Sequence, residues 1–179
     1  PENHGIIFPG GYYLQNGEIP KTLIITGENN LTAFDFAERE HLDAVFFKIK
    51  NKADALDYLL KEWGLREEEI FFAFDDILDL GMASRCGLGF FINNTGNPML
   101  QQYVVQKKLC AYKTGNSGDK NAVRELTELA LGLLGQYEPT LTNRMHFDPN
   151  YTTYLSKRNM LKTAFFTLSE HSILEVTRP

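Results

Sequence analysis

Three carboxylates lie close together at the end of an apolar run. Asp75 and Asp76 directly follow the segment 70–74, IFFAF, and Asp79 comes three residues later. Mg²⁺ takes oxygen ligands and is held by one or two carboxylates together with water, so the adjacent pair could bind this ion. An equally good role for Asp75 or Asp76 is to cap a helix that begins after the strand. The spacing leaves both roles open.

The elements that would position these acids alternate regularly along the chain. Short apolar runs rich in β-branched and aromatic residues predict strands at 22–26, 43–47, 70–74, 88–92 and, more weakly, 109–112. Apolar residues at helical spacing and capping residues predict helices from Asn30 through Glu38 and at 52–63, 76–86, 98–105 and 122–134. The first 17 residues are hard to interpret, with a short strand at 6–8 as one option.

This alternation of strands and helices predicts an α/β fold. We expect a Rossmann-like parallel sheet with helices on both faces, joined by right-handed crossovers. Residues 1–135 would form this domain. Residues 136–179 would be a C-terminal extension whose packing the sequence does not indicate, with a linker or meander at 136–150, a helix at 151–161 and one strand at 163–176. Ligands of such sheets bind beyond the carboxyl ends of the strands, which is where Asp75 and Asp76 are expected.

Composition narrows the possible partners. The chain has 179 residues, 43% hydrophobic residues and a net charge of -5, which is typical of a globular domain. It has no Lys/Arg cluster for nucleic acid and no apolar run long enough for a membrane span. Cys86 and Cys110 are too few for a disulfide framework, and no leader is visible, so we expect a cytoplasmic protein.

Four segments in order resemble the haloacid dehalogenase superfamily. They are TLIITGE, KNKADALDYLLKEWGL, IFFAFDDILDL and GNSGDKNAVRE, and the resemblance covers roughly residues 20–135. It is strongest to the capless branch of 3-deoxy-manno-octulosonate 8-phosphate phosphatase, which includes phosphatase-like domains of acylneuraminate cytidylyltransferases. The resemblance implies a Mg²⁺-dependent phosphatase that acts on a small acidic sugar phosphate and forms a homotetramer, with Tyr12 and Tyr13 as candidate contact residues.

The resemblance also assigns roles to individual residues. Thr26 would hydrogen-bond the phosphoryl group, beside a glycine that lets the backbone approach closely. Lys52 would pair with the phosphoryl oxygens from a helix start, where the dipole favours anions. Asp75 would bind the metal with Asp76, and Asp79 would orient a loop or a metal-bound water. The ordinary alternatives are a strand-end threonine and a solvated lysine, and Lys48 and Lys50 are nearby rivals for the role of Lys52.

Two further positions bear on this resemblance. Arg124, in the NAVRE segment, has a guanidinium suited to phosphate or carboxylate, and a salt bridge that anchors its helix is at least as good an explanation. Phe74 stands where the family usually has a glycine before the two acids, and a bulky ring there would weaken metal binding.

The nucleophile of the family is not evident. Its motif, DxDGxxT on the first strand, has no match; Glu2 and His4 in the string ENHG are weak candidates for the two acids. A competing alignment puts GGYYLQNGEIP on the family's first helix, so that the first strand lies outside this sequence. Two functions follow: a phosphatase, or a catalytically inactive homologue that serves as an oligomerisation or regulatory domain.

Overall fold

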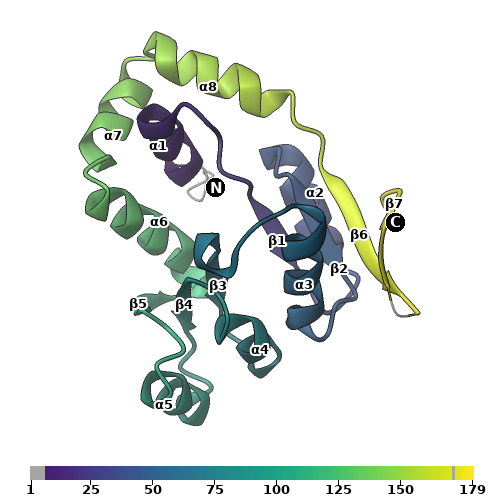
Figure 1. Ribbon diagram of the computed structural model, residues 1–179. Coiled ribbons are helices and arrows are strands. Elements are labelled where there is room, and N and C mark those ends of the chain that lie inside the picture. Colours follow the sequence, from purple (N-terminus) through teal and green to yellow (C-terminus); the bar gives the residue numbers. More distant parts are fainter. Residues whose placement is uncertain (1–6, 171) are drawn as a thin grey trace.

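The computed structural model describes residues 7–170 and 172–179 (Figure 1). The strands are β1 (Leu23–Ile25), β2 (Ala44–Phe47), β3 (Phe71–Phe74), β4 (Leu88–Asn93), β5 (Tyr112–Ser117), β6 (Ala164–Ser169) and β7 (Ser172–Val176). The α-helices are α1 (Ile7–Asn16), α2 (Leu31–Glu40), α3 (Lys52–Glu62), α4 (Leu80–Ala83), α5 (Pro98–Gln106), α6 (Ala122–Leu133), α7 (Tyr137–Met145) and α8 (Pro149–Asn159). The 3-10 turns are η2 (Glu67–Glu69), η3 (Ile77–Asp79) and η4 (Gly118–Lys120).

The described strands form two sheets. One has the order β1-β2-β6-β7 and the other β3-β4-β5. Neighbouring strands are parallel except for the antiparallel pair β6–β7. Because helices connect the parallel strands and cover the sheets, the predicted α/β architecture with a parallel sheet is confirmed.

The strand β2 is the centre of the first sheet and is buried along its whole length. On one face, α2 packs Phe34 against Phe47 of β2. On the other face, α3 packs Leu59 beside Phe46 and Phe166. A strand buried on both faces reads as a continuous apolar run, which is why AVFF was recognisable in the sequence.

The second sheet is arranged in the same way around β4. Phe91 of β4 packs with Leu100 and Val104 of α5 on one face. Phe90, next along the strand, faces Leu126 of α6 on the other. The helices therefore cover both faces of this sheet as well.

The C-terminal residues contribute more structure than the sequence indicated. The predicted linker at 136–150 is wrong, because α7 occupies 137–145. The helix predicted at 151–161 corresponds to α8, and the single strand predicted at 163–176 is a hairpin of β6 and β7. Figure 1 shows α8 running from α7 across to β6, and β6 pairs with β2.

A strand at 6–8 is also wrong, because Phe8 lies in α1. This helix packs on α6, α7 and α8. Its glycines permit the close approach: a Cβ added at Gly11 would lie 2.3 Å from a Leu131 methyl carbon and 2.6 Å from the Thr140 hydroxyl oxygen. The tertiary packing thus outweighs the low helix propensity of paired glycines.

Two other boundaries differ from the sequence predictions. The weak strand predicted at 109–112 is wrong in position, since β5 begins only at Tyr112 and continues to Ser117. The helix predicted at 76–86 is divided into η3 and the short α4. No helix in the described part of the chain is both long enough and apolar enough to cross a bilayer.

Candidate functional site

The ends of β1, β2 and β3 bring the predicted residues to one region. A Cβ added at Gly27, after β1, would lie 3.9 Å from Lys52 Nζ, after β2. One added at Gly81, after β3, would lie 3.7 Å from Ala53 Cβ. The first turn of α3 therefore lies between the end of β1 and the start of α4, so that the two sheets contribute to one site.

Lys52 is the first residue of α3, and the Asn51 side chain caps this helix by accepting a hydrogen bond from Ala53 N. The lysine is only 6% exposed. Its Nζ donates a hydrogen bond to Ile49 O at 3.0 Å, and within the described ranges it makes no ion pair. Burial lowers the pKa of Lys52, and the negative charges of Asp79 and Asp76 oppose this effect. A buried ammonium without an ion-pair partner is costly, so this region favours an added anion.

Asp79 and Asp76 both serve as caps. Asp79 is buried, and its Oδ2 accepts hydrogen bonds from Asp76 N at 3.1 Å and Asp75 N at 3.4 Å. Asp76 Oδ1 accepts one from Leu78 N at 2.9 Å and so caps η3. The capping alternative considered for the pair thus applies to Asp76, which keeps its second carboxylate oxygen for another ligand.

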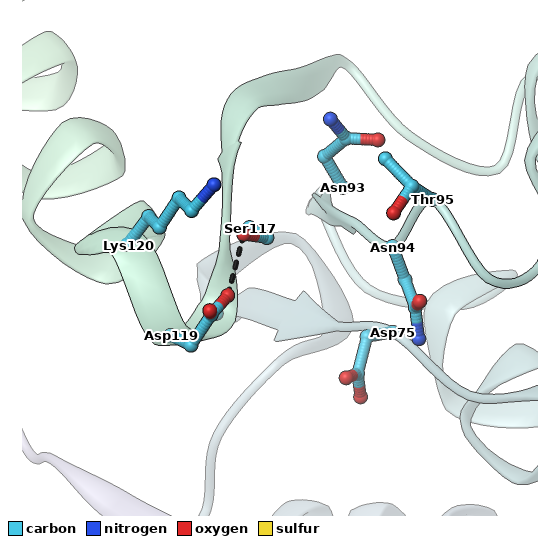
Figure 2. A pocket seen from close by; sticks show the side chains of 8 residues that line it. Asp75, Asn93, Asn94, Thr95, Ser117, Asp119 and Lys120 are labelled. Atoms are coloured by element: carbon cyan, nitrogen blue, oxygen red, sulfur yellow. Dashed lines mark hydrogen bonds between the residues drawn. The ribbon is translucent and has the colours of Figure 1, made fainter.

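Asp75 has a different environment. Desolvation raises the pKa of its carboxyl group, and the neighbouring charge of Asp76 adds to the increase. The side chain lines a cavity of about 380 Å³ at the carboxyl ends of β3, β4 and β5 (Figure 2). An acid that faces a cavity and has a shifted pKa is a candidate for a functional role.

The other residues that line this cavity were not given roles from the sequence, although four of them lie in the GNSGDKNAVRE segment of the resemblance. They are Asn93, Asn94, Thr95, Ser117, Gly118, Asp119 and Lys120. Figure 2 shows Asn94 near Asp75, while Lys120 lies at the opposite end. The polar residues NNT after a buried strand, and the GNSGDK run, were the available signals for these positions.

The segment 115–116, which precedes Ser117 of the cavity lining, is held by Glu125 of α6. Its carboxylate accepts hydrogen bonds from Gly115 N at 2.8 Å, Asn116 N at 2.9 Å and Tyr112 Oη at 2.7 Å. Burial acts to raise the pKa of Glu125, but these hydrogen bonds outweigh it and the pKa is lowered. Glu125 therefore positions the loop, a role that the sequence analysis missed.

Arg124, by contrast, forms an ion pair with Glu128 one turn later on α6, at 2.6 Å. This contact agrees with the alternative of a salt bridge within the helix. Among the described residues, the Thr26 hydroxyl makes only long contacts of 3.4 Å, with the backbone of Glu28. Its hydroxyl is consequently weakly held and able to bond a ligand. Glu2 and His4 lie outside the described residues.

The donor set near Asp75 suits a hard cation with few protein ligands. Among the residues that the structure describes, no group of three or more His, Cys, Asp or Glu side chains could hold a metal ion. Mg²⁺ needs only one or two carboxylates when water and substrate phosphate complete its shell. The Asp75 carboxylate and the second oxygen of Asp76 fit that requirement.

Comparisons with known proteins identify the fold. No family model matches the chain, and no curated protein matches it. Among solved structures, a protein described as a probable YrbI-family phosphatase from Pseudomonas syringae pv. phaseolica is 25% identical. It has a TM-score of 0.65, and the match covers 79% of this chain and 74% of that one.

Two further solved structures are 3-deoxy-D-manno-octulosonate 8-phosphate phosphatases. The one from Moraxella catarrhalis, in complex with magnesium, phosphate and 3-deoxy-D-manno-octulosonate (KDO), is 22% identical with a TM-score of 0.64, covering 78% and 74% of the two chains. The cobalt-bound one from Haemophilus influenzae is 20% identical with a TM-score of 0.59, covering 75% and 72%. The chain therefore has the fold of haloacid dehalogenase-type phosphatases and resembles their 3-deoxy-D-manno-octulosonate 8-phosphate phosphatase branch.

Proposed function

We propose that this chain binds the phosphoryl group of a small acidic sugar phosphate beside Lys52. The observation that carries the proposal is the ammonium of Lys52, which is buried at a helix start and has no ion-pair partner among the described residues. A phosphoryl group would supply the missing anion, and the amino end of α3 adds a favourable dipole. The phosphatases of similar fold give the substrate class.

Each residue would have a separate task in this complex. Lys52 would neutralise phosphoryl charge, and the Thr26 hydroxyl would donate a hydrogen bond to a phosphoryl oxygen. Asp75 and Asp76 would hold Mg²⁺, which supplies Lewis-acid neutralisation of the transferring group when bound. Asp79 would keep the segment 75–76 in place through its backbone hydrogen bonds. Arg124 would act only by supporting α6.

We propose that hydrolysis by this chain is slow. Phosphatases of this fold use a positioned carboxylate as the nucleophile. The carboxylates whose charges act on Lys52 are Asp79 and Asp76, and both are engaged as caps. Charge stabilisation without covalent attack leaves only activation of water. The second candidate, a homologue that binds ligand but is catalytically inactive, is favoured by this same arrangement.

Calorimetric titration with inorganic phosphate tests the binding proposal. Wild-type protein and Lys50→Met are expected to bind equally, because Lys50 is 76% exposed and pairs with Glu28. Lys52→Met is expected to lose at least about tenfold in affinity, as is typical when a charged partner is removed. Equal phosphate affinity in Lys52→Met and wild type would contradict the proposal.

A parallel titration with Mg²⁺ tests the metal ligands. Weak binding is expected in the wild type and loss of that binding in Asp75→Asn, since the substitution removes the charge but keeps the shape. Undetectable Mg²⁺ binding in both proteins would contradict the metal assignment without affecting the phosphate proposal.

We also propose the assembly and the compartment. A homotetramer, as the resemblance implies, should give a fourfold monomer mass in light scattering at micromolar protein. Tyr13 is a poor candidate for the contact surface, because its ring packs against Tyr154 at a centroid distance of 5.8 Å.

A reducing compartment such as the cytoplasm is supported by Cys86 and Cys110, which are both free thiols.

A further inference from the structure

The cavity beside Asp75 has a uniformly polar lining. Its volume is about 380 Å³, and none of the described residues that line it has an apolar or aromatic side chain. Small-molecule sites are usually lined mostly by apolar and aromatic groups, so this cavity suits a ligand that is polar over its whole surface. A nucleotide base would find no ring on which to stack, and an acyl or aryl group would find no apolar contact.

The loop that follows β4 is held against β5 on one side of this cavity. Asn93 N donates a hydrogen bond to Thr114 Oγ1 at 2.8 Å, and Asn93 Nδ2 donates one to Gly115 O at 3.2 Å. Asn94 Oδ1 accepts a hydrogen bond from Gly96 N at 3.0 Å. These contacts position the lining before a ligand arrives, which reduces the entropic cost of binding.

Some polar groups of the lining are left for a ligand. The Asn94 side chain uses its oxygen for Gly96 N, so its Nδ2 can donate to a bound molecule. The Thr95 hydroxyl has no hydrogen-bond partner among the described residues. An amide nitrogen that donates and a hydroxyl that both donates and accepts match the hydroxyl groups of a polyol.

Lys120 supplies the positive charge of the lining, at the end opposite Asp75 (Figure 2). Its ammonium makes no ion pair with any described residue. The adjacent acid, Asp119, accepts a hydrogen bond from Ser117 Oγ at 2.5 Å, and this bond lowers the pKa of Asp119. The Asp119 carboxylate is thus ionised but engaged by Ser117, and the ammonium is available to an anionic group of a ligand.

We propose that this cavity recognises the alcohol portion of the phosphate ester, and that this portion is a polyhydroxylated carboxylate of monosaccharide size. Lys120 binds its carboxylate, Asn94 and Thr95 bind its hydroxyl groups, and its phosphoryl end lies toward Asp75. Lys120 is then a specificity-determining residue. The inference rests on the proposed function, since it assumes a phosphoryl group bound beside Lys52.

Two phosphate esters that differ in one group test the inference. 6-Phosphogluconate has a carboxylate where glucitol 6-phosphate has a hydroxymethyl group, and the two molecules are otherwise identical. Calorimetric titration of the whole chain with Mg²⁺ present should give about tenfold tighter binding of 6-phosphogluconate. Lys120→Met should bind the two esters equally. Lys113→Met should retain the preference, because Lys113 bonds Gln101 and does not line the cavity.

Inorganic phosphate separates this inference from the proposed function. Lys120→Met should bind inorganic phosphate as the wild type does, whereas Lys52→Met should weaken both esters by a similar factor. Ester binding without binding of inorganic phosphate would contradict the site at Lys52 and support the cavity. Equal binding of the two esters to the wild type, or binding of neither, would overturn the inference whether or not inorganic phosphate binds. A preference that persists in Lys120→Met would also overturn it.

Variants of Thr95 test the contacts with hydroxyl groups. Thr95→Val keeps the shape but removes the hydroxyl, and should weaken both esters about three- to tenfold, whereas Thr95→Ser should not. Phenyl phosphate, which has no hydroxyl group on its carbon portion, should bind more weakly than glucitol 6-phosphate. Tighter binding of phenyl phosphate than of both esters would contradict a polyol ligand and overturn the inference.

Discussion

Two opposing effects act on the pKa of Lys52. Its burial at the first turn of α3 disfavours the charged form, whereas Asp79 and Asp76 favour it. Neither carboxylate forms an ion pair with the ammonium, because both accept backbone hydrogen bonds near η3. The folded chain thus retains a charge that is costly for stability but well suited to bind an anion.

Replacing this charge should stabilise the free protein. Lys52→Met is expected to raise the free energy of unfolding by about 1–2 kcal/mol, because an apolar side chain of similar length avoids the desolvation cost. Lys50→Met should change it by less than about 0.5 kcal/mol, as for other exposed positions. Urea unfolding measures both values. Destabilisation of Lys52→Met would mean that the ammonium is well compensated in the folded state.

Phosphate binding should depend on pH through Lys52. Its pKa in the folded state lies below 10.5, so the ammonium loses its proton within the alkaline range. We expect phosphate affinity to fall in alkaline solution below pH 10.5, where phosphate itself stays a dianion, and Lys52→Arg to lack this fall. In the same window the unfolded chain binds more protons than the folded one, so stability should rise with pH. Affinity that is constant over this range would contradict the role of Lys52.

At the scale of elements, α1 depends on a close approach to its neighbours. Gly11→Ala is expected to destabilise the protein by about 1–3 kcal/mol, because the added Cβ would overlap Leu131 and Thr140. Gly132→Ala in α6 is the matched control, since nothing lies within 4 Å of its Cβ. It should stabilise the helix by about 0.5–1 kcal/mol. Thermal and urea unfolding measure both effects, and equal effects of the two substitutions would refute the packing explanation.

The junction of β5 and α6 depends on Glu125. Glu125→Gln is expected to cost about 1–3 kcal/mol, since the charged acceptor of two backbone N–H groups is lost. Glu128→Gln on the same helix should cost less than about 1 kcal/mol, because its pair with Arg124 is partly exposed.

The pH dependence of this junction checks the same contact. Because the pKa of Glu125 is lowered, its contribution is present above pH 4.5 and lost as pH falls through the folded pKa. Hydrogen exchange of Gly115 and Asn116 should accelerate in Glu125→Gln. Unchanged exchange at both amides would exclude the anchoring role.

The elements that were predicted correctly from the sequence are those that are buried on both faces. Strands β2 and β4 were identified because both faces are buried and their sequences are continuously apolar. The strand β5 was misplaced because its residues, YKTGNS, are polar and are held by pairing and by Glu125. The local pattern did not predict helix α1, because its paired glycines serve packing rather than local propensity, and only the competing alignment put GGYYLQNGEIP on a helix.

The candidate site was predictable in part for a similar reason. Asp75 and Asp79 follow a strand that is conspicuous in the sequence, and the family resemblance supplied Thr26 and Lys52. Asn94 follows β4 and Lys120 lies in η4, and only the tertiary structure brings these two segments to the cavity. The runs NNT and GNSGDK mark these segments in the sequence, but the runs alone do not show which side chains face the cavity.

At the scale of the whole molecule, the site lies at the carboxyl ends of strands from both sheets: β1 and β2 of the first sheet and β3 of the second. The first sheet supplies Lys52 and Thr26, and the second supplies Asp75. We propose that residues 1–135 form the phosphatase-like unit and that 136–179 extend it, with β6 adding to the sheet beside β2. Glu2 and His4, the weak candidates for the nucleophile, lie outside the described residues.

A single ³¹P NMR experiment tests binding and turnover together. The sample contains the protein, Mg²⁺ and 3-deoxy-D-manno-octulosonate 8-phosphate. We predict that the ester resonance broadens or shifts in the wild type but not in Lys52→Met, and that little inorganic phosphate accumulates. An unperturbed ester resonance in the wild type, or rapid Mg²⁺-dependent release of phosphate that Asp75→Asn abolishes, would contradict the account.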